Sequence, residues 1–222
     1  MATSGPKGVL TISSRNYSSW SLRGWLICKM ARLNFTERKL DADDPSARAE
    51  LLHLSPSFLV PKLDYDRAEV WDVMAIAEFL NEIKPEAKIF PADRNARAHC
   101  RAVSGEMHQG FINLRSALPM NIKAKFPNFK IWAGAQGDID RVVSIWRTCL
   151  KTYGGPFLFG VEPTLADAMF APVCSRLATY DVRLERDVVA YRDHILHWAL
   201  MEEWAEAARE EPEELEELDV EF

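Results

Sequence analysis

The stretch from residue 16 to residue 26, NYSSWSLRGWL, gathers hydroxyl side chains where a helix is expected to begin. Leu22, Trp25 and Leu26 follow at the spacing of a helix with one buried face. One serine is enough to cap a helix, because its side chain accepts a hydrogen bond from an N–H group of the first turn. A cap therefore accounts for one hydroxyl, and the stretch offers several: Tyr17, Ser18, Ser19 and Ser21.

The sulfur and imidazole side chains do not have the spacing of a metal or redox site. The cysteines lie far apart, each within an apolar helical pattern: Cys28, Cys100, Cys149 and Cys174. We predict that they are buried thiols in a reducing compartment. Asp193, His194 and His197 share one face of a predicted helix, but a further ligand at suitable spacing is missing, so we predict no metal site.

The charge of the chain is concentrated at its end. The formal net charge is −6, and eight carboxylates fall in residues 210–221, EEPEELEELDVE. Without these eight, 25 acidic residues face 27 Lys and Arg, so the rest of the chain is near +2. We predict a solvated, poorly ordered tail over 210–222. The body could accept a small anion, but it has no dense basic patch of the kind that binds nucleic acid.

Apolar patterning divides the chain into two parts. Residues 1–84 alternate strand and helix signals: a strand at 8–14, a helix at 22–33, a strand at 34–41, a helix at 45–54, a hairpin at 60–72 and a helix at 73–83. This order predicts a small sheet covered by helices. No segment has the length of apolar residues needed to cross a bilayer, and no secretory signal is present, so we expect a cytoplasmic protein without membrane contact.

The second part is predicted to be entirely helical. Two prolines mark residues 85–92 as a linker, and apolar residues then recur at intervals of three or four over 93–118. Further helices are predicted over about 137–153 and 164–180, and more helix over 187–209. Thr164 and Asp167 form a capping box with Asp in place of Glu, which we assign to folding and not to chemistry.

This order of elements, together with four local sequences, resembles the cytosolic glutathione transferase family. The sequences are YSSWSLR (17–23), VPKL (60–63), VWDVMAIAEFL (70–80) and GPFLFGVEPTLADAMFAPV (155–173). The resemblance implies a thioredoxin-like N-terminal domain over 1–84 that binds glutathione and an all-α domain over 93–209 that lines the pocket for a second substrate. It also implies that glutathione acts as a co-substrate, that no other cofactor is needed, and that the protein is a homodimer.

By this resemblance, YSSWS is similar to the Ser-Ser-Cys-Ser motif of the zeta-like, serine-type transferases, with Trp20 in place of cysteine. Ser18 would then face the glutathione sulfur, with Ser19 as its substitute and Tyr17 as a rival. A hydrogen bond to a charged group contributes about 1.5–3 kcal/mol, which lowers a thiol pKa by roughly one to two units. The alternative is that the serine only caps the helix.

Two further sites are implied for the peptide part of glutathione. The Val60-Pro61 bond would be cis, which turns the backbone of Val60 toward the cysteinyl part of glutathione; the alternative is a trans proline that starts an edge strand. Asp72 would contact the γ-glutamyl end or act as a helix cap. Val73 stands where the family usually has serine, so one donor to the γ-glutamyl carboxylate is missing, which would weaken binding by roughly tenfold or more.

The acceptor pocket would lie between the two domains. Tyr17, Trp20 and His108 are its candidate residues; His108 could relay a proton, or it could belong to a solvated face or a subunit interface. The resemblance implies a detoxifying transferase that conjugates the glutathione thiolate to an electrophilic, mostly apolar substrate. The alternatives are a glutathione-dependent isomerase or ether-cleaving enzyme for one metabolite, and a binding protein that has lost turnover.

Overall fold

A four-stranded sheet forms the core of the first part of the chain. The computed structural model describes residues 8–40 and 60–212. The strand order is β2-β1-β3-β4, where β1 spans Gly8–Ile12, β2 Phe35–Lys39, β3 Lys62–Tyr65 and β4 Ala68–Trp71. Strand β2 is parallel to β1, while β3 is antiparallel to both β1 and β4. The apolar residues of GVLTI suit the central β1, and the charged FTERK lies at the edge.

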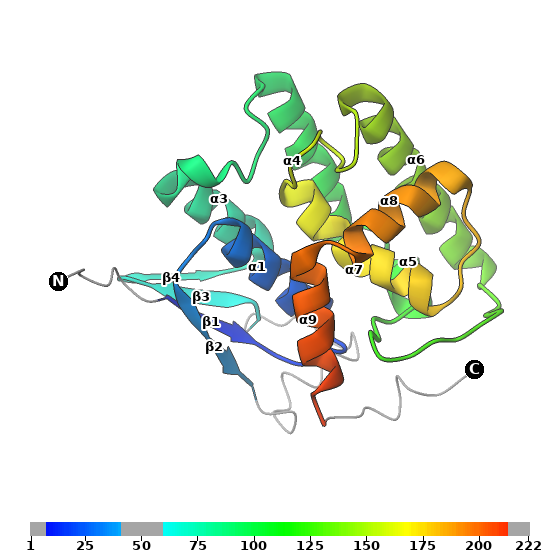
Figure 1. The fold of residues 1–222 in the computed structure, drawn as a ribbon, viewed down its shortest axis with the longest axis horizontal. Helices are drawn as coiled ribbons and strands as arrows, with labels where there is room; N and C mark the ends of the chain where they lie inside the picture. The colour runs from blue at the N-terminus through cyan, green and yellow to red at the C-terminus, as the bar shows by residue number, and fades with distance from the viewer. Residues whose placement is uncertain (1–7, 41–59, 213–222) are drawn as a thin grey trace.

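Two helices pack on this sheet and on each other: α1 (Ser19–Met30) and α3 (Val73–Ile83). Helix α3 has one apolar face, with Ile76, Ala77 and Leu80 buried. Helix α1 is buried on nearly all sides, because the sheet and α3 cover one side and helices of the second part cover the other. Helix α1 therefore joins the two parts of the molecule, as Figure 1 shows.

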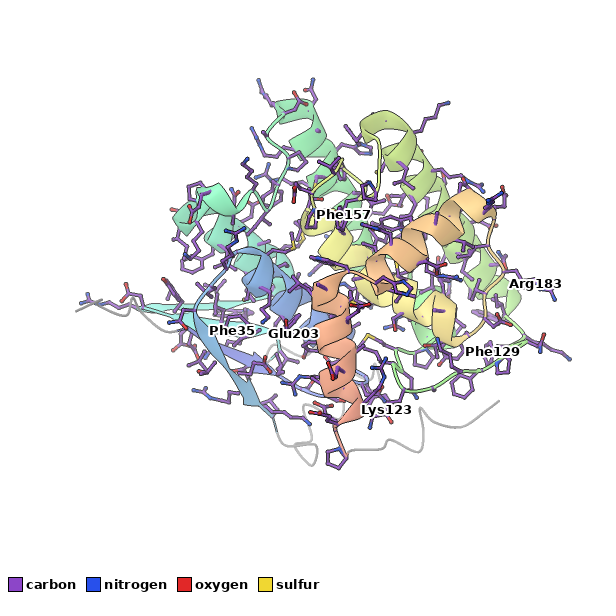
Figure 2. All side chains as sticks on the ribbon, viewed as in Figure 1. Phe35, Lys123, Phe129, Phe157, Arg183 and Glu203 are labelled. Atoms are coloured by element: carbon purple, nitrogen blue, oxygen red, sulfur yellow. The ribbon has the colours of Figure 1, made fainter. Side chains whose placement is uncertain are left out.

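The second part is built from helices around α7 (Leu165–Thr179), which is buried along almost its whole length. The others are η1 (Pro85–Ala87), α4 (Arg94–Gln109), α5 (Ile112–Ala117), α6 (Ala133–Tyr153), α8 (Arg186–Leu196) and α9 (Ala199–Arg209). Helix α9 returns to α1, where the rings of Trp25 and Trp204 have centroids 5.3 Å apart. In Figure 2, Glu203 of α9 is labelled; its carboxylate lies 2.6 Å from Lys29 Nζ of α1.

The helix predicted over 93–118 is divided into two, which corrects the sequence analysis. The stripe over 93–118 breaks at Gly110 and Phe111, between α4 and α5. A Cβ on Gly110 would lie 2.8 Å from the Glu106 carbonyl oxygen, and Phe111 adopts a left-handed conformation with φ of 59°. The apolar stripe continues across this break, so periodicity gave no sign of it. The helix predicted over 187–209 consists of α8 and α9, separated by His197 and Trp198.

The remaining elements agree with the sequence analysis, within a few residues at their ends. The helix predicted over 45–54 lies outside the described residues. Helix α3 ends at Ile83 and α4 begins at Arg94, on either side of the predicted linker. None of the helices within 8–40 and 60–212 combines the length and apolarity needed to cross a membrane.

Candidate functional site

Ser18 is the N-cap of α1. Its Oγ accepts a hydrogen bond from the Ser21 backbone N–H at 3.2 Å, and its backbone is extended, with φ of −87° and ψ of 100°. Ser18 is therefore the residue that caps the helix, and it is also the residue that the sequence analysis assigns to chemistry. The two roles are compatible, because a hydroxyl that accepts a cap bond still carries a proton of its own to donate.

The loop before Ser18 is held by a second serine. Ser14 Oγ accepts hydrogen bonds from the backbone N–H groups of Asn16 (3.1 Å) and Tyr17 (3.3 Å). Its carbonyl accepts the Ser18 N–H at 3.0 Å. Tyr17, Ser18 and Ser19 are all buried. The position of the Ser18 hydroxyl is thus set by Ser14 on one side and by the first turn of α1 on the other.

Glu211 secures the same loop from the far end of the chain. Its Oε2 accepts the Ser14 hydroxyl at 3.1 Å and the Arg15 backbone N–H at 2.8 Å. Its Oε1 pairs with the Arg15 guanidinium at 3.2 Å and with Lys39 Nζ at 3.0 Å. Lys123 Nζ donates to the Glu211 carbonyl; Figure 2 shows Lys123 near the end of α9.

Glu211 is an exception to the prediction of a solvated tail over 210–222, of which residues 213–222 lie outside the described residues. Its side chain is 5% exposed and surrounded by cations. At the sequence level it is one carboxylate in a run of eight, and its partners are remote along the chain, so the sequence gave no means of separating it from the others.

The peptide bond between Val60 and Pro61 is cis, as the sequence analysis predicts. Pro61 packs directly on Gly24 of α1. A Cβ built on Gly24 would lie 2.4 Å from the Cβ of Pro61. The glycine therefore lets the helix approach this proline closely, and any side chain at position 24 would displace one of them.

Asp72 is the N-cap of α3. Its Oδ1 accepts the backbone N–H groups of Met74 at 2.8 Å and Ala75 at 3.3 Å. Its backbone has φ of 74°, which an L-residue rarely adopts and which costs energy unless surrounding contacts enforce it. The neighbouring Val73 is 1% exposed and belongs to the apolar core, so its side chain offers no donor to a ligand at the start of the helix.

The second oxygen of Asp72 binds the other part of the molecule. His108 Nε2, on α4, lies 2.5 Å from Asp72 Oδ2. Burial pushes the pKa of Asp72 upward, but the bond to His108 and those to the backbone N–H groups outweigh it and leave the pKa below its ordinary value. Asp72 is thus an anion, so His108 Nε2 is the donor in this contact.

Trp20 brings His108 close to the start of α1. Its ring centroid lies 5.2 Å from that of His108. The guanidinium carbon of Arg23 lies 4.6 Å from the Trp20 ring and that of Arg115 lies 5.4 Å away. Of the predicted acceptor-pocket residues, the structure therefore brings Trp20 and His108 together, while Tyr17 is buried in the loop before Ser18.

Arg23 and Arg115, which lie on the Trp20 ring, form a positive cluster with Arg176. Arg23 Nε donates to the Met169 carbonyl of α7 at 2.8 Å, and Arg176 Nη1 donates to the Leu118 carbonyl at 2.6 Å. Burial, together with the charge of Arg115, lowers the pKa of Arg176 to about 9; burial and the other two arginines lower that of Arg23. Within residues 8–40 and 60–212, no carboxylate forms an ion pair with any of the three. The positive potential beside the start of α1 favours an anion there.

Family models match both parts of this chain. Residues 17–83 match the model of the glutathione S-transferase N-terminal domain, and residues 129–209 match that of the C-terminal domain. The chain belongs to the glutathione transferase family. This confirms the family that the four local sequences indicate, and with it the fold of a small α/β domain followed by a helical one.

Among curated relatives of this transferase are maleylacetoacetate isomerases. The probable enzyme of Caenorhabditis elegans is 26% identical over 171 residues, which cover 77% of this chain and 78% of the relative. The enzyme of Rattus norvegicus is 27% identical over 179 residues, covering 80% and 82%.

Solved structures of the same fold include two with bound ligands. A glutathione transferase homologue from Burkholderia gl BGR1, with bound glutathione, has a TM-score of 0.68 at 22% identity and covers 92% of this chain and 99% of its own. A maleylacetoacetate isomerase from Anaeromyxobacter dehalogenans 2CP-1 has a TM-score of 0.68 at 21% identity and covers 96% of each chain. Its active site holds dicarboxyethyl glutathione and citrate. At these identities, the likeness establishes the fold.

The thiols of this transferase are core residues, as predicted. All four cysteines are buried, and burial raises the pKa of each, that of Cys100 to about 11 and that of Cys149 to about 12. A buried thiol with a raised pKa is a poor nucleophile. What the sequence analysis missed is the arginine cluster. Its signal was present, because Arg23 and Arg176 stand among apolar residues of helices that are buried on nearly all sides.

Proposed function

We propose that this glutathione transferase uses the Ser18 hydroxyl to stabilise the thiolate of bound glutathione, which then attacks an electrophilic carbon of a mostly apolar second substrate. The observation that carries this proposal is the position of Ser18 at the N-cap of α1, in a chain whose family binds glutathione. Ser19 and Tyr17 are adjacent alternatives for the contact with sulfur.

The physical basis is a shift in the thiol equilibrium. A free thiol has a pKa near 8.5, so only a small fraction is ionised at neutral pH. A hydrogen bond from Ser18 contributes about 1.5–3 kcal/mol, or roughly one to two pKa units. The positive end of α1 and the arginines around Trp20 act in the same direction. Together they would make the thiolate the major species.

The peptide part of glutathione would bind along the first domain. The backbone of Val60, turned by the cis bond, would pair with the cysteinyl residue. The start of α3, with the Asp72 carboxylate, would receive the γ-glutamyl end. Val73 withholds the hydroxyl that the family usually places there, so this end of the ligand needs a donor from elsewhere.

A glutathione-dependent isomerase is the second candidate, favoured by the names of the curated relatives. In that reaction the thiolate would add to one carbon of a double bond, the resulting single bond would rotate, and elimination would restore both the double bond and the thiolate. Glutathione would not be consumed. Measuring glutathione consumption against product formation therefore separates an isomerase from a conjugating enzyme, and no turnover with retained binding would indicate a binding protein.

The test is a titration of the purified protein with glutathione, followed by the ultraviolet absorbance of the thiolate. We expect the wild type to develop the thiolate band near neutral pH, and Ser18→Ala to bind glutathione without it. Ser19→Ala is the matched control and should retain the band. If the band persists in Ser18→Ala and disappears in Ser19→Ala or in Tyr17→Phe, then Ser19 or Tyr17, respectively, stabilises the thiolate.

We also propose that the transferase works as a homodimer in the cytoplasm. Two-fold dimers are the commonest soluble homo-oligomers, and the reducing compartment suits its four thiols. Size-exclusion chromatography with light scattering would give the mass of the protein in solution. A mass near the 25.3 kDa of one chain would contradict the dimer.

A further inference from the structure

His108 lies on α4, in the second part of the molecule, and its side chain contacts Asp72 at the start of α3. The contact joins Nε2 of His108 to Oδ2 of Asp72 at 2.5 Å, while Oδ1 of Asp72 caps the helix. The His108 side chain is 28% exposed and that of Asp72 is 40% exposed, so a ligand can reach both. The pair is thus a polar contact between the two parts that remains open to solvent.

We infer that His108 binds the α-carboxylate at the γ-glutamyl end of glutathione, and that Asp72 and His108 together hold the zwitterion at that end. This inference rests on the proposed function. It places His108 on the glutathione side of the site, whereas the sequence analysis assigned it to the acceptor pocket.

The chemistry of the ligand matches the pair. The γ-glutamyl end carries an ammonium and a carboxylate on one carbon. The Asp72 carboxylate can accept from the ammonium at Oδ2, which has a lone pair besides the one that accepts from His108. A protonated imidazole has two donors: Nε2, which is occupied by Asp72, and Nδ1, which can serve the ligand carboxylate.

The composition of the helix start explains why such a donor is needed. Val73 is buried in the core and has no hydroxyl. The N–H groups of Met74 and Ala75 already bond to Asp72 Oδ1. A ligand carboxylate at this helix start therefore finds few donors on α3. His108 supplies one from α4, and its charge adds to the attraction.

The charges around His108 decide how binding depends on pH. Asp72 of α3 favours the protonated imidazole. From α1, the Trp20 ring faces His108 and also favours a cation, whereas Arg23 and Arg115, which lie on the same ring, oppose one. A donor at Nδ1 exists only when the imidazole is protonated, so affinity for the γ-glutamyl end should be lower where the ring is neutral than where it is charged.

The experiment uses the full chain and S-methylglutathione, which has no ionisable thiol, so that sulfur chemistry cannot contribute to the pH profile. The second probe is its analogue without the α-carboxylate, S-methyl-(4-aminobutanoyl)-cysteinylglycine. We expect His108→Ala to weaken S-methylglutathione about tenfold and the analogue by less than twofold, as measured by calorimetry near pH 6. His99→Ala is the matched control: His99 lies on the same helix but bonds to Tyr153 at 2.9 Å.

His108→Gln keeps an amide donor for Asp72 and does not titrate. We expect its affinity for S-methylglutathione to be independent of pH between 5.5 and 8, whereas that of the wild type falls by several-fold. This variant also covers the case in which His108→Ala does not fold. Equal losses of the two probes in His108→Ala, or a wild-type profile that His108→Gln reproduces, would overturn the inference.

These outcomes separate the inference from the proposed function. If the wild type binds S-methylglutathione as expected but forms no thiolate with glutathione, the proposal for Ser18 fails while that for His108 stands. If the thiolate forms normally and His108→Ala changes neither affinity, only the inference for His108 fails. A wild type that binds neither glutathione nor S-methylglutathione overturns both.

Discussion

The Ser18 hydroxyl has two partners in our account, the backbone of α1 and the sulfur of glutathione. The first is present in the structure as the bond from the Ser21 N–H. In the second, the hydroxyl would donate its proton to the sulfur. A single substitution should therefore affect both stability and chemistry, and the two effects are measurable under different conditions.

The cap is measured without glutathione. We expect Ser18→Ala to lower the free energy of unfolding in urea by about 1 kcal/mol, because the first turn of α1 loses its side-chain acceptor. Ser18→Thr, which keeps the hydroxyl, should lower the free energy of unfolding by less. If Ser18→Ala is as stable as the wild type, the cap bond contributes nothing to the fold.

A substitution of Val73 is expected to change glutathione affinity and stability in opposite directions. Val73→Ser should tighten glutathione binding by roughly tenfold, because it adds a donor at the start of α3. It should also lower the free energy of unfolding by about 1–3 kcal/mol, since Val73 is fully packed in the core. Val73→Ala loses the same two methyl groups as Val73→Ser but gains no hydrogen-bond donor, so it is the matched control. Equal glutathione affinities of the Ser and Ala variants would show that position 73 does not contact the ligand.

At the level of elements, we assign some helix ends to the folding of the chain and others to the proposed site. Asp167, at the start of α7, is fully buried and belongs to the first kind. It accepts the Thr164 N–H at 2.8 Å, the Leu158 N–H at 2.9 Å and the Tyr191 hydroxyl at 3.1 Å. The capping box that the sequence predicts is therefore the centre of a larger network that also holds α8.

Asp167→Ala should leave several buried donors unpaired and lower the free energy of unfolding by about 3–5 kcal/mol. Activity per folded molecule should stay within twofold of the wild type, because Asp167 holds α7 and not the ligand. The measurement is urea unfolding together with activity normalised to the folded fraction. A selective loss of activity in a stable variant would contradict this assignment.

Asp72, at the start of α3, belongs to the second kind, and its charge gives a pH dependence. Its pKa in the folded protein lies below the ordinary value of 3.8, so the folded state favours the charged form. The resulting stability is present above about pH 4 and is lost as the pH falls through the lowered pKa. Asp72→Asn keeps a capping side chain but no charge. We expect the stability difference between wild type and Asp72→Asn to shrink below pH 4; a constant difference down to pH 2 would contradict it.

The sequence predicted local elements better than contacts between them. Apolar periodicity located α1, α3 and α7, and the predicted end of α6 at residue 153 is correct, whereas its start was placed four residues late. It could not show the break between α4 and α5, because the buried stripe continues across Gly110. At the site, the family resemblance predicted the cis bond at Pro61. The bond from His108 to Asp72 spans 36 residues and depends on how two parts of the chain pack, which local patterns do not encode.

For the molecule as a whole, the site depends on contacts that connect the two ends of the chain. Glu211 lies 197 residues from Ser14, and one carboxylate joins Ser14, Arg15 and Lys39. Ser14 in turn holds the backbone N–H of Tyr17, the residue before Ser18. Glu211 is therefore part of the structure that fixes the loop before Ser18, although it contributes no group to the proposed chemistry.

Glu211→Ala tests this connection. We expect the loss of a buried carboxylate that pairs with two cations to lower the free energy of unfolding by about 2–4 kcal/mol. Because Ser14 and Arg15 lose their acceptor, the loop before Ser18 should become less well fixed, and the pKa of the bound glutathione thiol should rise toward its solution value. Glu210→Ala, at the exposed neighbouring residue, removes the same charge without these contacts. If both variants titrate glutathione like the wild type, Glu211 stabilises the fold without positioning Ser18. If Glu210→Ala has the larger effect, the net charge of the tail matters more than the contacts of Glu211.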